Sequence, residues 1–179
     1  VREVLEVPIV GTVPAIKPAA AMTRTGTIGL LGTEATIRQG YVDRLEHEFA
    51  QGKRLLRAAA PALVAAAEAR LRGEPVDPQF YAAAADALRM QPGGEAIDTV
   101  VLACTHFPLV EPELAQAFGP GVRFVHGAEG IARRIAFLTQ GQEFQRLRPD
   151  LALFTRDGEE SARLADSLKT YGLLRIEIL

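Results

Sequence analysis

The chain is organised around one segment, Asp98-Thr99-Val100-Val101-Leu102-Ala103-Cys104-Thr105-His106-Phe107-Pro108, which holds its single cysteine. The apolar residues from Val100 to Ala103 form the short unbroken run that is typical of a buried parallel strand, and Pro108 ends it. Cys104 therefore lies where a strand gives way to a loop. Ligands of doubly wound α/β folds bind at the carboxyl ends of the strands. A thiol, a hydroxyl and an imidazole at this place therefore predict a functional site.

The composition is that of an ordinary soluble globular protein, with 48% hydrophobic and 23% charged residues in 179. The formal net charge is −2 and no block of Lys and Arg stands out, which argues against nucleic acid or a membrane surface as a partner. A small polar ligand is the expected partner. One cysteine excludes an internal disulfide and a multi-thiolate metal cluster, and it agrees with a reducing compartment.

No apolar run approaches the roughly 20 residues of a membrane span, and the start Val1-Arg2-Glu3-Val4 does not have the layout of a signal peptide, so we expect a cytoplasmic protein. The chain lacks an initial Met. Its segment Glu3-Val4-Leu5-Glu6-Val7-Pro8-Ile9-Val10-Gly11 predicts the end of a helix followed directly by a strand at residues 8–13. We therefore expect a fragment whose earlier part is absent. Pro14 and Pro18 cannot donate to a ladder, so a turn or a short helix should follow.

Strands alternate with helices along the rest of the chain, which implies a mainly parallel sheet covered on both faces. The expected strands are residues 27–31, 53–57 at a sheet edge, 100–103, 122–125, 151–155 and 173–179. The expected helices are one after Thr33 that carries Ile37, Tyr41, Leu45 and Phe49, and others at about 61–71, 78–90, 109–118, 128–138 and 161–171.

A second polar feature follows the strand at residues 27–31. Thr33 is a good N-cap, and Glu34 lies in the first turn of the helix that it would begin. The turn presents the hydroxyls of Thr33 and Thr36 and free backbone N–H groups at a helix start. Such a place suits a carboxylate or a phosphate.

A catalytic Cys104 would need a neighbour that lowers its pKa or accepts its proton, because the thiolate is the useful base or nucleophile and a free thiol titrates near about 8.5. His106 is that neighbour: residues i and i+2 of a strand point to one side, so the two side chains can face one pocket if extended backbone persists past the strand. The side chain of Thr105 would then point away. The competing interpretation is that Cys104 is a buried small hydrophobe, which is the most frequent fate of a lone cysteine.

The other polar candidates are weaker. His47 lies between Glu46 and Glu48 and is expected on the solvated surface, because metal-ligand partners at helical spacing are absent. His126 follows a strand and precedes a helix, so it is a minor candidate for the same crevice. On pattern alone, Glu68 is a solvated charge on an alanine-rich helix.

The run Leu102-Ala103-Cys104-Thr105-His106-Phe107-Pro108-Leu109 resembles the second cysteine motif of bacterial glutamate racemases, cofactor-independent enzymes that make D-glutamate for peptidoglycan. Three further segments are similar to family segments in the same order. Residues 8–19 resemble the entry into the second domain, residues 25–36 the threonine-bearing strand and helix start, and residues 60–64 with Glu68 the cysteine-proline helix. The likeness spans residues 7–108 and fades from Gly141 onward.

The resemblance implies roles by position. Cys104 matches one of two catalytic cysteines, each of which abstracts or returns the α-proton on one face of glutamate. His106 matches a histidine that assists this thiol, and Glu68 a carboxylate that gives further acid–base support. Threonines that hold the charged groups of the substrate match Thr33, Thr36 and Thr105. No cofactor and no metal are implied, because an acid and a base on opposite faces of the carbon can invert it alone.

Two family motifs are absent from the 179 residues, the N-terminal Asp-Ser-Gly and the Cys-Asn-Thr that supplies the first cysteine. One thiol cannot serve both faces of the substrate, so we expect this chain by itself not to racemise glutamate. Ala103 replaces the usual glycine before the cysteine, and Ala60 replaces the cysteine before the proline.

The resemblance implies an α/β fold of two doubly wound, mainly parallel-sheet domains with the site between them, the first domain being incomplete here. Residues 1–14 would end the first domain, residues 15–130 would form the second domain with Cys104, and residues 131–179 would return to the first. A homodimer is compatible with such families.

Three alternatives stay open. Aspartate and hydantoin-type racemases share the two-cysteine plan, although aspartate racemases tend to carry glutamate where His106 stands. A thiol hydrolase would use Cys104 as the nucleophile and His106 as the base. A non-catalytic binding module could keep the fold without the chemistry.

Overall fold

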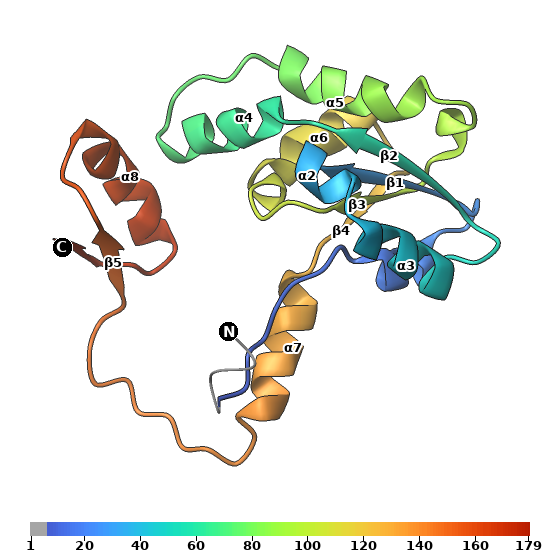
Figure 1. The fold of residues 1–179 in the computed structure, drawn as a ribbon. Coiled ribbons are helices and arrows are strands. Elements are labelled where there is room, and N and C mark those ends of the chain that lie inside the picture. The colour runs from blue at the N-terminus through green and yellow to red at the C-terminus, as the bar shows by residue number, and fades with distance from the viewer. Residues whose placement is uncertain (1–6) are drawn as a thin grey trace.

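A four-stranded parallel sheet forms the core of the main body in the computed structural model, which describes residues 7–179 (Figure 1). Its strands are β1 (Thr27–Gly32), β2 (Arg54–Ala59), β3 (Thr99–Leu102) and β4 (Arg123–Val125), in the order β2-β1-β3-β4. All three neighbouring pairs are parallel. Every residue of β1 and β3 is buried, as expected of strands covered on both faces. The α/β class, the parallel pairing and the edge position of β2 are thus confirmed.

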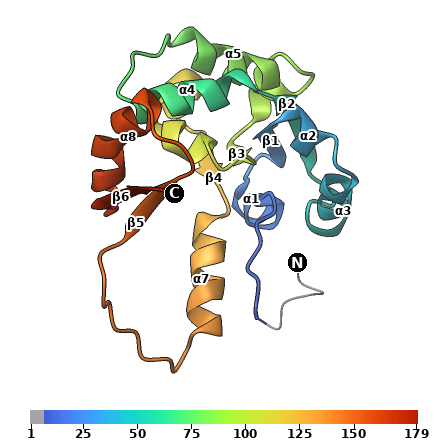
Figure 2. The same cartoon turned by 60° about the vertical axis from the view of Figure 1, so that its left-hand side comes forward.

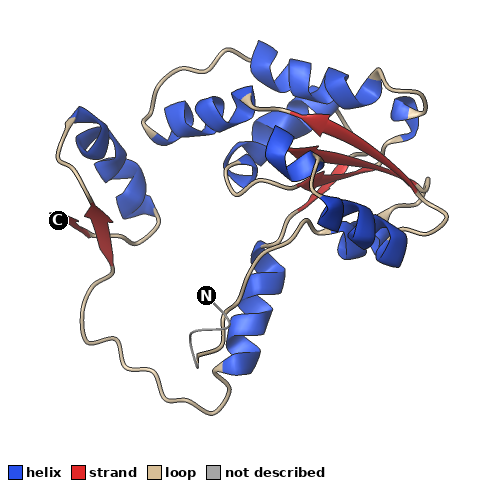
Figure 3. Ribbon diagram, in the orientation of Figure 1, coloured by secondary structure: helices blue, strands red, loops and turns tan. Residues whose placement is uncertain are grey.

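Helices cover both faces of this sheet (Figure 3). One face packs against α4 (Ala62–Leu71), α5 (Gln79–Arg89), the short η1 (Gly94–Ala96) and η2 (Phe107–Val110), and α6 (Glu111–Phe118). The other face packs against α1 (Ile16–Met22) and α3 (Gly40–Phe49). Successive residues of a strand point to opposite faces. Accordingly, Val100 and Leu102 join the first core cluster and Val101 joins the second.

Two details of the N-terminal part differ from the expectation. Residues 8–13 form no strand, and none of the strands in residues 7–179 pairs with this segment. Val7 and Val13 are exposed. Pro8 and Pro14, at the ends of the segment, have no backbone N–H to donate to a neighbouring strand. The predicted helix end at residues 3–6 lies outside the described residues. The short helix predicted after residue 14 is present as α1.

The helix predicted after Thr33 is split into α2 (Glu34–Ile37) and α3. Gln39 is extended and caps α3, and Gly40, a poor helix former, is its first residue. The apolar stripe of the prediction is nevertheless real, because Ile37, Tyr41, Leu45 and Phe49 all pack against the same core cluster.

The C-terminal part leaves the sheet along α7 (Ala128–Leu138), which projects away from it in Figures 1 and 2. After a segment without regular structure, β5 (Leu151–Phe154) and β6 (Arg175–Ile178) form a second, two-stranded parallel sheet, with α8 (Glu159–Thr170) as the crossover. This unit touches the main body through α8, whose Ser167 hydroxyl donates to the Leu71 carbonyl at the end of α4. No helix within residues 7–179 combines the length and apolar character needed to cross a membrane.

Candidate functional site

The carboxyl ends of β1 and β3 bring two candidate segments to one edge of the sheet. Leu31 of β1 lies opposite Leu102 of β3, and the Ala103 N–H donates to the Leu31 carbonyl at 2.8 Å. Thr33 and Cys104 follow these paired positions at the same level. From β1 the chain continues to its neighbour β2 on one side, whereas from β3 it continues to its neighbour β4 on the other side, so the two connections diverge between β1 and β3. In open α/β sheets, such a switch point is where ligands bind.

A turn brings Cys104 and His106 together. β3 ends at Leu102, the Phe107 N–H donates to the Cys104 carbonyl at 3.2 Å, and His106 has helical backbone angles (φ −77°, ψ −33°). The extended backbone expected past the strand is therefore absent, and that part of the prediction was wrong. Cys104 Sγ still lies 3.8 Å from His106 Nδ1, because the turn folds the imidazole back over the thiol.

Cys104 is a free, half-buried thiol that borders the apolar core cluster without being enclosed by it. Reactive cysteines are partly exposed and have a polar partner, whereas structural ones are buried and inert. The partial exposure and the imidazole therefore argue against the interpretation as a packing residue. Thr105, between the two, is exposed.

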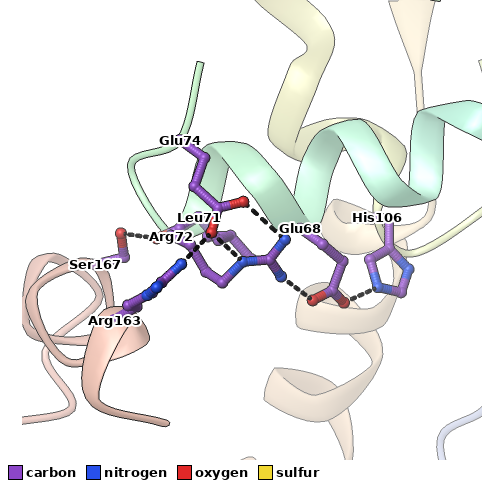
Figure 4. A network of polar contacts seen from close by, with 7 residues as sticks. All are labelled: Glu68, Leu71, Arg72, Glu74, His106, Arg163 and Ser167. Atoms are coloured by element: carbon purple, nitrogen blue, oxygen red, sulfur yellow. Dashed lines mark hydrogen bonds and ion pairs between the residues drawn. The ribbon is translucent and has the colours of Figure 1, made fainter. Parts of the chain in front are cut away.

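Glu68 completes the group from the neighbouring helix (Figure 4). The buried Ala66 and Ala67 fix the inner face of α4, which packs on η2 just after His106. This packing places Glu68 Oε1 at 2.9 Å from His106 Nε2. Glu68 is thus not the solvated charge that the pattern alone suggested.

The carboxylate decides how the imidazole is protonated. Glu68 can only accept, so neutral His106 carries its proton on Nε2 and donates it to Oε1. The Nδ1 lone pair then faces Cys104 and can take the thiol proton. The series thiol, imidazole and carboxylate is an arrangement that activates a thiol and steadies the resulting imidazolium.

Thr33 is the N-cap of α2, as predicted. Its hydroxyl accepts from the Thr36 N–H at 3.2 Å, and the two hydroxyls lie 3.0 Å apart. Both side chains are half-buried at the end of β1. The pair offers polar groups to the same sheet edge as Cys104.

The remaining histidines lie elsewhere. His47 is exposed on α3, which confirms the expectation. His126 follows β4, where its Nδ1 accepts from the Ala128 N–H at 3.3 Å and its Nε2 lies 3.8 Å from a Glu111 oxygen. It borders a groove between residues 7–18 and α7, and Cys104 does not line that groove.

The sequence analysis missed the polar network that extends from Glu68 through Arg72 and Glu74. Arg72 lies one helical turn beyond Glu68, with a guanidinium nitrogen 3.5 Å from Glu68 Oε2. It also holds Glu74 through two bonds of 2.9 and 3.0 Å, and these bonds keep the pKa of Glu74 below its usual value. The spacing of Glu68 and Arg72, four residues apart on a helix, was the available signal.

Comparison with known proteins gives one family. A model of the Asp/Glu/hydantoin racemase family matches residues 1–135. The glutamate racemase of Sphingopyxis alaskensis is 58% identical over 178 residues, which cover 99% of this chain and 66% of that protein. The glutamate racemase of Escherichia coli O139:H28 is 37% identical over 181 residues, which cover 99% and 62%. The chain therefore spans just under two thirds of the length of these relatives.

Solved structures agree. The crystal structure of Escherichia coli glutamate racemase in complex with L-glutamate and the activator UDP-MurNAc-Ala matches with a TM-score of 0.90 at 35% identity, over 99% of this chain and 67% of that one. A glutamate racemase isoform from Bacillus anthracis matches with a TM-score of 0.77 at 24% identity, over 99% and 66%, and shows the fold alone. With the family model covering most of its length, the chain belongs to the Asp/Glu/hydantoin racemase family.

Proposed function

We propose that this chain carries one catalytic half of a cofactor-independent glutamate racemase. The observation that supports it most is the series from Cys104 Sγ through His106 to Glu68, with steps of 3.8 and 2.9 Å, at the carboxyl edge of a parallel sheet. The relatives named above, which include one at 58% identity, are glutamate racemases.

In the proposed mechanism, His106 Nδ1 takes the thiol proton of Cys104 and the resulting imidazolium is held by Glu68. The Cys104 thiolate then removes the α-proton from one face of glutamate, leaving the electron pair on the carbon. An acid on the opposite face donates a proton to this carbon, which inverts it. In the reverse direction, the Cys104 thiol gives its proton to the carbanion. The opposite-face thiol is not among the 179 residues, which hold one cysteine.

Thr33, Thr36 and Thr105 are the proposed substrate-holding residues. The hydroxyls of Thr33 and Thr36 lie at the start of α2, and Thr105 is exposed beside Cys104. Hydrogen-bond donors at this edge suit the carboxylates of glutamate and the negative charge that develops when the α-proton leaves.

The domain division is proposed with the function. The whole four-stranded sheet falls within residues 15–130, whereas β5 and β6 form a separate sheet within residues 131–179. We assign residues 1–14 and 131–179 to the first domain, with the site between the domains. A cytoplasmic role in supplying D-glutamate for peptidoglycan, and a homodimer, belong to the same proposal.

Deuterium exchange at Cα tests the function. The product of the whole natural gene that encodes these residues is incubated with L- or D-glutamate in D2O, and Cα deuterium and optical rotation are followed. We expect exchange and racemisation with the wild type and with the exposed control His47→Ala, and loss of racemisation with Cys104→Ala. Absence of exchange in the wild type, or full racemisation by Cys104→Ala, would overturn the proposal.

The same assay separates the alternatives. Exchange with aspartate or a hydantoin but not with glutamate would identify another racemase of the family. Acylation of Cys104 by a chromogenic amide without Cα exchange would identify a thiol hydrolase. Binding of glutamate without either reaction would leave a binding module.

A further inference from the structure

The polar network around Glu68 continues beyond the three residues used in the mechanism (Figure 4). Arg72 contacts Glu68 on one side and donates hydrogen bonds to both carboxylate oxygens of Glu74 on the other. Its side chain is only 18% exposed, less than the 39% of Glu68. A guanidinium held by a two-point carboxylate contact is fixed in orientation, because both partners are planar.

Arg72 contacts the carboxylate oxygen of Glu68 that does not bond to His106. Oε1 accepts from His106 Nε2, while Oε2 lies 3.5 Å from a nitrogen of Arg72. A partly exposed carboxylate without the second contact could rotate about its side-chain torsions. The Arg72 contact restrains that rotation and keeps Oε1 directed at the Nε2 proton of His106.

The network also reaches the C-terminal unit. Arg163 of α8 lies 3.2 Å from Glu74 Oε1, and the Ser167 hydroxyl one turn later on α8 donates to the Leu71 carbonyl, the residue before Arg72. Both contacts join α8 to the end of α4, as Figure 4 shows. The packing of α8 against the end of α4 therefore helps to hold the side chain of Glu74 in place, and Glu74 in turn holds the guanidinium of Arg72.

We propose that Arg72 is a positioning residue that holds Glu68 against His106 Nε2, and that Glu74 and Arg163 anchor it, so that the docking of α8 on α4 supports the tautomer of His106 that faces Cys104. The kinetic part of this inference rests on the proposed racemase function. The tautomer part does not, because it concerns the resting protein.

The test combines nitrogen-15 NMR of His106 with steady-state kinetics, on the full gene product labelled at histidine and with His106→Asn used to assign the signals. In the wild type, the neutral ring should be protonated at Nε2. In Arg72→Met, we expect mixed tautomers and a kcat about fivefold lower with little change in KM, the upper end of the effect expected for loss of a partly exposed ion pair. Arg72→Lys should recover part of both, because lysine supplies the charge without the fork.

One further variant tests the contribution of Arg163, and another serves as a control. Arg163→Met should move the tautomer signal and kcat in the same direction by a smaller amount, about threefold, because Arg72 keeps its bonds to Glu74. Arg133→Met is the matched control: Arg133 also pairs with a glutamate four residues earlier on a helix, Glu129, but this pair is exposed on α7. It should leave both readouts unchanged.

If Arg72→Met has the same tautomer populations and the same kcat as the wild type, the inference is wrong. If Arg72→Met does not fold, as judged by its melting temperature, Arg72→Lys and Glu74→Gln decide in its place, and wild-type tautomers in both would refute the inference. If the wild type does not exchange deuterium into glutamate, the proposed function fails, while the tautomer result still decides the role of Arg72.

Discussion

Leu31 of β1 lies opposite Leu102 of β3 in neighbouring parallel strands. Thr33 follows Leu31 by two residues, and Cys104 follows Leu102 by two residues. The register of one strand pair thus puts the hydroxyl-bearing helix start and the thiol at the same level of the sheet edge. A variant at this edge can therefore change the chemistry while the strand register stays intact.

Removing the imidazole should cost more than weakening its carboxylate partner. His106→Asn leaves no group that can accept the Cys104 proton, so kcat should fall by about 10² or more. Glu68→Gln keeps an oxygen that can accept the Nε2 proton but loses the charge that stabilises the imidazolium, so a drop of about tenfold is expected. Rates of Cα deuterium exchange measure both, and a larger loss in Glu68→Gln than in His106→Asn would contradict this order.

Thr33 should have a structural and a binding effect that one pair of variants can separate. Thr33→Ala removes the N-cap of α2 and should lower the free energy of unfolding by about 1 kcal/mol. It should also raise KM for glutamate, whereas Thr33→Ser, which keeps the hydroxyl, should do neither. Urea unfolding and initial rates give the two numbers, and an unchanged KM in Thr33→Ala would remove Thr33 from the binding site.

Asp98 should make stability depend on acid. Its carboxylate accepts hydrogen bonds from the hydroxyls of Thr23 and Thr99 and from the N–H groups of Arg24 and Thr25. Burial by itself would raise its pKa, but these bonds outweigh burial and lower the pKa to about 2. A pKa below the unfolded value means that the stabilisation is present above about pH 4 and is lost as the pH falls toward 2.

The matched variant for this effect is Asp98→Asn. At neutral pH it should cost about 1 kcal/mol of unfolding free energy, a value that allows for screening at a partly exposed site. The difference from the wild type should shrink between pH 4 and pH 2. A difference that stays constant over this interval would show that ionisation of Asp98 does not contribute.

Gly94 has no room for a side chain. A Cβ there would lie 2.4 Å from the Leu88 carbonyl oxygen and 2.5 Å from that of Arg89, and backbone atoms at the end of α5 cannot move aside cheaply. Gly94→Ala should therefore destabilise the protein by about 2–3 kcal/mol. The control is Gly40→Ala, at an open position of α3 with nothing within 4 Å, which should be neutral or slightly stabilising. Equal melting temperatures for the two variants would disprove the steric argument.

The sequence was most informative where local pattern and burial coincide. The apolar runs of β1 and β3 are buried along their whole length, so their composition predicted them, and the threonine N-cap of α2 was recognisable from local chemistry. Residues 8–13 have the composition of a strand but no partner strand in residues 7–179, and pairing is a tertiary property that composition does not encode.

The site was predicted only in part, because some of its contacts depend on tertiary packing. Cys104 and His106 were paired correctly, but by strand alternation where the structure uses a turn. Glu68 could be assigned only by resemblance, because its contact with His106 depends on how α4 packs on η2. Arg163 joins the network across a separation of 89 residues from Glu74, which no local pattern reports.

The parallel pair β5–β6 has a kinetic consequence. Within residues 7–179, each strand has one hydrogen-bonded neighbour, and Leu151, Leu153 and Ile178 are more than 40% exposed, so local opening of this pair costs little. In the 179-residue chain, its amide hydrogens should exchange with solvent orders of magnitude faster than those of β1 and β3. Because α8 is the crossover between these strands, the anchor that reaches Arg72 belongs to this weakly held unit. Its contact with α4 should therefore be made and broken as the unit opens and closes.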